Sequence, residues 1–175
     1  MQKKTIYFAS FVVLLAIVAL CGWWYLSSST TQGQDTAAVD RSALVRPHSP
    51  NEGRVDAPVV IVEFFDPACE TCRDFYPIVK NLMKQYPNDV RLVLRYAPFH
   101  AGSDKVVKLL EASKRQDKYW QTLEALLAAQ PSWASHGSPN LEAAYQAAAQ
   151  IGLDVKKALA DAQTPEIEAV LKQDV

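Results

Sequence analysis

Cysteine and histidine are scarce in this sequence, with three of each among 175 residues. Cys69 and Cys72 form a Cys-x-x-Cys pair, but no second such pair and no His-x-x-x-His pair accompanies it, which disfavours a structural zinc site. An excess of one charge is also lacking, because the formal net charge is −1, and this excludes the basic balance typical of nucleic-acid-binding proteins. No repeat period emerges either, which argues against stacked repeats.

The most informative stretch of the chain is 59–73, VVIVEFFDPACETCR. Apolar and β-branched residues from Val59 to Phe65, interrupted only by Glu63, predict a buried strand that ends at an Asp-Pro turn. After the cysteines, apolar side chains recur at the spacing of a helix, at Phe75, Ile78, Val79, Leu82, Met83 and Tyr86. The sequence therefore predicts a strand that delivers two cysteines to the start of a helix.

This placement gives the two cysteines different chemical roles. Backbone N–H groups at a helix N-terminus lack partners and carry partial positive charge, which stabilises a thiolate. The pKa of a free cysteine, about 8.5, falls to roughly 3.5–7.5 in such motifs. We expect Cys69 to be the exposed nucleophile and Cys72, one turn further along, to be the deeper resolving thiol, so that the pair cycles between dithiol and disulfide. The carboxylate of Glu70 opposes the helix dipole, which predicts a less extreme oxidant.

Three other uses of the cysteine pair stay open at this point. The pair could form half of a zinc site or a purely structural disulfide. It could also hold Cu(I), since soft thiolate ligands suit that ion. The third cysteine, Cys21, lies in an apolar segment near the N-terminus and supplies no further ligand close to the pair. Redox chemistry is the interpretation that the sequence favours.

The N-terminal segment has the character of a membrane anchor. Residues 6–26 contain no charged side chain, and a run of 21 such residues exceeds the 7–15 residues of a signal-peptide core and matches the roughly 20 needed to cross a bilayer. We therefore expect a signal anchor or transmembrane helix over residues 1–26. The basic residues on its amino side would place the rest of the chain on the outer side of the membrane, anchored by this segment; cleavage to a soluble form is the alternative. The flanking residues are Lys3 and Lys4 on one side and Trp23, Trp24 and Tyr25 on the other.

Residues 27–42 are small and polar and predict a flexible linker. The domain that follows reads as a short edge strand at 43–46, a turn at 51–53 and a second core strand at 90–96, which a long crossover would make parallel to the first. Cap residues, prolines and apolar spacing then predict a series of helices. The expected helices cover 104–114, 117–130, 139–151, 155–162 and 165–175.

These features together resemble the DsbA-type branch of the thioredoxin superfamily. The matching motifs are Glu63-Phe64-Phe65, Pro67-Ala68-Cys69-Glu70-Thr71-Cys72, Pro77 five positions later, and Asp56-Ala57-Pro58-Val59 before the strand. The resemblance implies an α/β thioredoxin-like fold with an inserted helical domain. It also implies thiol–disulfide exchange on exported proteins, with no dissociable cofactor, no metal and a membrane redox partner.

By this resemblance Cys69 is the attacking thiol, Cys72 the resolving thiol and Glu63 the buried acid that passes protons to and from the resolving cysteine. Physical reasoning on Glu63 agrees, because a carboxylate on a buried strand is desolvated and its pKa rises towards neutrality. An acid that merely reaches water at the end of the strand is the alternative. His100, just after the second strand, is a weaker candidate to approach the thiols.

The sequence departs from the family after its helical part. Family members continue with a cis-proline loop, a β-hairpin and a final helix, and none of these follows here. We therefore expect residues 43–98 to form the first half of a thioredoxin core and residues 99–175 a helical domain that is incomplete at its C-terminus. The missing hairpin would pair with strand 59–65, so this strand should keep an open edge.

Two classes of function follow from these observations. The first is an enzyme, a thiol:disulfide oxidoreductase or isomerase that uses Cys69 and Cys72. The second is a non-catalytic product, either an inactive truncated fragment or a thiol-based copper-binding module.

Overall fold

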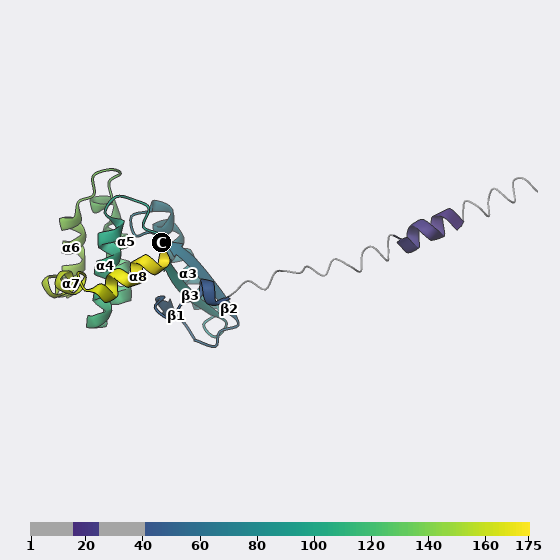
Figure 1. Ribbon diagram of the computed structural model, residues 1–175, viewed down its shortest axis with the longest axis horizontal. Coiled ribbons are helices and arrows are strands. Elements are labelled where there is room, and N and C mark those ends of the chain that lie inside the picture. The colour runs from purple at the N-terminus through teal and green to yellow at the C-terminus, as the bar shows by residue number, and fades with distance from the viewer. Residues whose placement is uncertain (1–15, 25–40) are drawn as a thin grey trace, which may run out of the picture. The chain divides into compact units, whose positions relative to one another are not determined.

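The computed structural model describes residues 16–24 and 41–175 (Figure 1). Residues 16–24 are helical, and residues 42–175 form a compact unit of their own. Within these described residues, no helix has both the length and the apolar character that a membrane crossing requires. Most of the expected anchor (1–26) and nearly all of the expected linker (27–42) lie outside the described residues, so both stay predictions.

The unit contains a small three-stranded sheet, and its strand order is β1-β3-β2. β2 (Val59–Phe65) and β3 (Val90–Tyr96) run parallel, in register from the pair Val59–Val90 to the pair Phe65–Tyr96. α3 (Glu70–Gln85) connects them, as the predicted crossover requires. In the described part of the chain β2 has no neighbour on its other side, so its outer edge is open as expected.

The helices gather on one side of the sheet and supply most of the core (Figure 1). They are α4 (Ser103–Ser113), α5 (Tyr119–Trp133), α6 (Leu141–Gln150), α7 (Val155–Asp161) and α8 (Pro165–Asp174), with a 3-10 turn at Lys114–Gln116. The main cluster of buried side chains joins β2 and β3 to α4 and α5, with Phe65, Leu92, Leu94, Tyr96, Val106, Leu110, Leu123, Leu126 and Trp133 among its members. A smaller cluster, rich in alanine, packs α4 against α6, α7 and α8.

Sequence reasoning was wrong about the first strand of the sheet. Residues 43–46, expected as a strand, include the end of a short helix, α2 (Arg41–Leu44). The edge strand is instead β1 (Asn51–Glu52), which was expected to be a turn and which pairs antiparallel with β3. A strand of two residues has no pattern of its own. Its pairing with β3, extended by the bond from the Leu94 N–H to the Pro50 carbonyl (2.9 Å), makes it a strand.

Two helix boundaries also differ from the prediction. α5 continues through Pro131 to Trp133, whose buried ring donates from Nε1 to the Leu126 carbonyl (2.9 Å). α6 begins at Leu141 rather than at the Ser-Pro pair, because Asn140 caps it by accepting from the Ala143 N–H (3.1 Å). The expected starts of α7 and α8 are confirmed.

The end of α8 is tied to the sheet through one buried carboxylate, that of Asp174. Its oxygens accept from Arg95 Nε (2.6 Å) and from the Tyr96 N–H (2.9 Å) on β3, and one of them lies 2.9 Å from His48 Nε2. The side chain of Arg95 is itself 3% exposed. Buried charges are stable only when paired and hydrogen-bonded, so this contact fixes the helical layer to the strand that carries the core.

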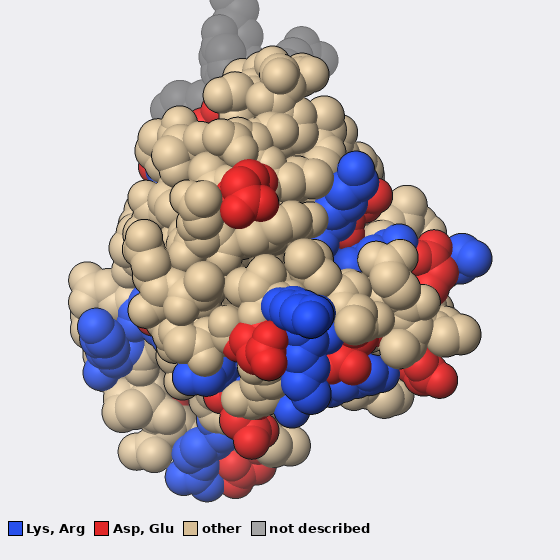
Figure 2. Space-filling model, turned by 90° about the vertical axis from the view of Figure 1, so that its left-hand side faces the viewer, with Lys and Arg blue, Asp and Glu red and all other residues tan. Residues whose placement is uncertain are grey.

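The surface of the unit mixes both signs of charge. On the face shown in Figure 2, lysine and arginine alternate with aspartate and glutamate over the lower part, and the upper part is almost free of charged side chains. This face therefore presents no broad field of one sign.

Candidate active site

Cys69 lies at the end of the loop that connects β2 to α3, and it is the N-cap residue of that helix. Its N–H donates to the Asp66 carbonyl (3.1 Å), which closes a tight turn before the helix. Its carbonyl accepts from the N–H of Arg73 (3.1 Å), the first bond of α3. The cysteine is half-buried and is a free thiol. The predicted position of Cys69 at a helix N-terminus is therefore what the structure has.

Cys72 lies one turn further into α3, also half-buried and free. Burial raises the pKa of the Cys72 thiol to about 12, and a hydrogen bond with the Cys69 side chain and the nearby Glu63 carboxylate add to the rise. A hydrogen bond with the Asp66 backbone opposes it. Cys72 therefore strongly favours its protonated form.

Glu63 stands on β2 beside Cys72, within the same hollow. Burial raises the pKa of Glu63 from its ordinary 4.5 to about 7. Its Oε2 atom is buried and has no hydrogen-bond partner among the described residues. An acid with this pKa holds a proton below neutrality and releases it above, which is the property that proton transfer near pH 7 needs.

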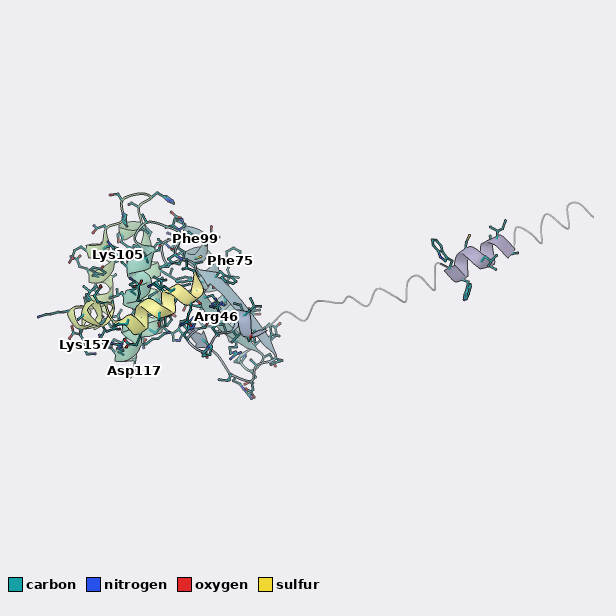
Figure 3. The ribbon with its side chains drawn as sticks, viewed as in Figure 1. Arg46, Phe75, Phe99, Lys105, Asp117 and Lys157 are labelled. Atoms are coloured by element: carbon teal, nitrogen blue, oxygen red, sulfur yellow. The ribbon has the colours of Figure 1, made fainter. Side chains whose placement is uncertain are left out.

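The hollow that holds both groups opens along the free edge of β2 and has a volume of about 360 Å³. Its other walls are mostly apolar: Ile61, Val62, Phe64, Thr71, Phe75 and Val79. Phe64 and Phe75 remain 55% and 56% exposed, and in the view of Figure 3 Phe75 lies on the other side of the unit from Lys157. An apolar hollow that reaches the Cys72 thiol offers space for an apolar side chain of another polypeptide.

Sequence reasoning missed Asp66, which organises the loop before Cys69. The carboxylate is almost fully buried and accepts five hydrogen bonds: from the Ala68 N–H (2.9 Å), the Phe99 N–H (2.8 Å), the His100 N–H (3.0 Å), His100 Nδ1 (2.8 Å) and Ser103 Oγ. Burial alone would raise the pKa of Asp66, but these bonds lower it below the ordinary value. The bond to Ala68 is an Asx-turn, which an aspartate before a proline favours, so this part had a local signal. The predicted helix 104–114 begins one residue earlier, at Ser103, whose hydroxyl donates to Asp66.

Gln130 of α5 is a second residue that sequence reasoning missed. Its Nε2 donates to the carbonyls of Pro67 and Cys69, both at 2.9 Å. Because both neighbours are acceptors, the amide orientation is determined, and the buried Oε1 atom has no hydrogen-bond partner in the part of the chain that the structure describes. The helical layer therefore holds the redox loop directly, and nothing in the sequence around Gln130 signals this role.

Two imidazoles lie near the motif from other elements. His136, in the loop after α5, places Nε2 3.0 Å from Glu70 Oε1, and the His100 ring is 5.7 Å from the His136 ring. The backbone N–H of Glu70 donates to its own carboxylate and lowers the pKa of that side chain. His136 and His100 lower the same pKa further. Within the described residues, no group of three or more His, Cys, Asp or Glu side chains is arranged to hold a metal ion.

Comparison with known proteins shows the family and the fold of the chain. The family model described as thioredoxin matches residues 46–175. A thioredoxin-like oxidoreductase from Silicibacter pomeroyi DSS-3 is 32% identical, with 77% of this chain and 75% of that chain covered and a TM-score of 0.66. Two structures below 25% identity share the fold: the thiol-disulfide exchange protein alpha-DsbA2 from Wolbachia pipientis (20%, 77% and 70% covered, TM-score 0.64) and Proteus mirabilis ScsC (18%, 99% and 77%, TM-score 0.61).

Among curated proteins, the chain is 24% identical over 168 residues to the Na(+)/H(+) antiporter NhaA of Herminiimonas arsenicoxydans. The match covers 94% of this chain but 26% of that protein, so the chain spans about a quarter of the relative's length. The expected α/β thioredoxin-like fold and the DsbA-type resemblance are confirmed by the family model and the solved structures. The chain belongs to the thioredoxin family, and its fold is that of the DsbA-like proteins within it.

Proposed function

We propose that the chain carries out thiol–disulfide exchange on exported proteins, with Cys69 as the attacking thiol and Cys72 as the resolving thiol. One observation carries the proposal: Cys69 is the N-cap residue of α3, while Cys72 lies one turn further along, half-buried in a hollow that it shares with Glu63. The apolar hollow next to the pair supports a polypeptide substrate rather than a small polar one.

In the oxidising direction, a substrate thiolate attacks Sγ of Cys69 in the Cys69–Cys72 disulfide. A bond forms between the substrate sulfur and Cys69, the bond to Cys72 breaks, and Cys72 leaves as a thiolate that takes up a proton. A second substrate thiolate then attacks the substrate sulfur of this mixed disulfide, and Cys69 leaves as a thiolate. Two electrons pass from the substrate dithiol to the cysteine pair. Reduction runs through the same steps in reverse.

Glu63 is proposed to supply and remove the proton of Cys72. With a pKa of about 12, the Cys72 thiol needs a base to lose its proton and regains one as soon as it leaves. Glu63 has a pKa of about 7 and lines the same hollow, so it exists in both protonation states near neutral pH. The structure offers Cys72 no second carboxylate in that hollow among the described residues.

The setting of this chemistry is part of the proposal. Residues 1–26 would anchor the protein in the inner membrane and residues 27–42 would form a tether, so that the exchange takes place in the bacterial periplasm. A membrane redox partner with its own exchangeable thiols would restore the pair after each turnover. Within the unit, residues 43–98 would form the redox half and residues 99–175 the helical half, joined by contacts such as that of Gln130 with Cys69.

Trapping of mixed disulfides tests the proposal. In a Cys21→Ser background, Cys72→Ala removes the resolving thiol, so substrates attacked by Cys69 should stay attached and appear as adducts on non-reducing gels. Cys69→Ala is the matched control and should capture nothing. If Cys72→Ala also captures nothing, while the protein with both thiols binds one Cu(I) per chain, the copper-binding alternative replaces the enzyme.

A further inference from the structure

His100 is a histidine outside the motif that is held in place by a buried charge. It lies in the loop between β3 and α4, and its side chain is about one-third exposed. Both its backbone N–H (3.0 Å) and its ring Nδ1 (2.8 Å) contact Asp66 Oδ2. The carbonyl of the same Asp66 accepts the N–H of Cys69 (3.1 Å). One residue therefore connects the imidazole to the turn that presents the thiol.

The contacts of Asp66 determine which ring nitrogen of His100 carries the proton. An ionised carboxylate only accepts hydrogen bonds, so Nδ1 must be the protonated nitrogen and Nε2 is the one that gains or loses a proton. The other oxygen of Asp66 is held by the Ala68 N–H and by Ser103 Oγ, so the carboxylate cannot turn away from the ring. This is the arrangement in which a buried acid orients an imidazole for a nearby nucleophile.

The other charged groups around the motif leave few sources of positive charge near Cys69. Arg73, on α3, is bound to its neighbour Asp74, with Nε at 3.1 Å and a terminal nitrogen at 3.0 Å from one carboxylate oxygen. His136, from the α5–α6 loop, faces Glu70, and this pair is largely exposed. The two residues between the cysteines, Glu-Thr, contribute a negative charge and a neutral side chain. His100 differs from these groups because its ring is held by the buried carboxylate of Asp66, in the turn that precedes Cys69.

We propose that Asp66 is a positioning residue that holds the His100 imidazole beside the Cys69 loop, and that the protonated imidazole favours the Cys69 thiolate. The reactivity of Cys69 at mildly acidic pH then depends on a histidine from the β3–α4 loop rather than from the motif. Coupling of this kind is reciprocal: a thiolate at Cys69 also favours the proton on His100. The inference rests on the proposed role of Cys69 as the attacking thiol.

The pH profile of alkylation tests this inference. In the full chain with Cys21→Ser and Cys72→Ala, iodoacetamide reports only Cys69, and its rate is measured from pH 5 to 9. His100→Gln should lower the rate at pH 6 by about three- to tenfold and leave the rate at pH 9 within about twofold, since a nearby opposite charge moves a titration by roughly that amount. His48→Gln is the matched control, because His48 binds the carboxylate of Asp174 rather than that of Asp66.

A second measurement needs no substitution of a histidine and remains valid if His100→Gln does not fold. The ring proton of His100 is titrated by NMR with Cys69 free and with Cys69 alkylated, and alkylation should lower the titration midpoint of His100 but not that of His48. Two results would overturn the inference. One is an alkylation profile of His100→Gln that superimposes on that of its parent; the other is a titration midpoint of His100 that is unchanged when Cys69 is alkylated. Neither readout requires substrate exchange, so both stay meaningful if the proposed enzymatic function fails.

Discussion

Replacing Glu63 by glutamine should stabilise the protein, and the gain should grow with pH. Burial raises the pKa of this carboxyl from 4.5 to about 7, so the folded state keeps a proton that the unfolded state has already lost. Between these two values the folded state binds more protons, and the free energy of unfolding therefore falls as pH rises. Above pH 7 the full penalty is present. Glutamine has the same shape and never ionises, so it avoids the penalty.

The size of this effect follows from the pKa change of Glu63. At 1.36 kcal/mol per pKa unit the penalty is at most about 3 kcal/mol. The carboxyl is only partly buried, and solvent screening reduces the expected gain to about 1–2 kcal/mol at pH 8. At pH 4, where glutamate is largely protonated in both states, the gain should be close to zero.

Urea denaturation of the reduced protein at pH 4, 6 and 8 measures the free energy of unfolding for both forms. Glu70→Gln is the control, because the pKa of this exposed acid lies below its ordinary value and its substitution should not stabilise the protein as pH rises. A stability difference between Glu63→Gln and the parent that is the same at pH 4 and pH 8 would show that ionisation of Glu63 does not destabilise the folded protein.

Three further predictions concern packing and the exposed hollow. Asp174→Ala leaves Arg95 buried without its carboxylate and should lower the free energy of unfolding by about 3–5 kcal/mol in urea denaturation; a loss below about 1 kcal/mol would contradict the ion-pair argument. Gln130→Leu removes two donors from the redox loop and should cost about 1–3 kcal/mol by the same assay, whereas Gln146→Leu, on the exposed face of α6, should cost less than about 0.5 kcal/mol. Phe75→Ser removes a ring that is 56% exposed and should reduce concentration-dependent association in light scattering, with unfolding free energy changed by less than about 1 kcal/mol; unchanged association would show that the ring is not part of a sticky surface.

The parts of the fold that the sequence predicted are those with a long, regular pattern. β2 and β3 are runs of seven mostly apolar residues, and α3 carries its apolar side chains at helical spacing over 16 residues. The two-residue β1 escaped detection because pairing with β3, rather than any local preference, makes it a strand. The same holds for the end of α5, where burial of Trp133 carries the helix past a proline.

In the candidate site, the residues that are close in sequence could be predicted, and those that reach the site from distant segments could not. Cys69, Cys72 and Glu63 are close in sequence, so a strand, a turn and a helix were enough to bring them together. Gln130 reaches the loop from 61 residues away, and no local pattern announces such a contact. Asp66 was visible as a turn residue, but its bonds to the β3–α4 loop depend on how the parallel strands place their ends, which the sequence alone did not specify.

A redox titration shows whether Cys69 and Cys72 act as one redox pair. The Cys21→Ser protein is equilibrated with glutathione buffers of graded ratio, its remaining thiols are alkylated, and mass spectrometry counts them. If Cys69 and Cys72 form a redox pair, we expect one reversible two-electron transition between two free thiols and an intramolecular Cys69–Cys72 disulfide. A pair that forms no intramolecular disulfide at any ratio, or joins only between chains, would contradict it.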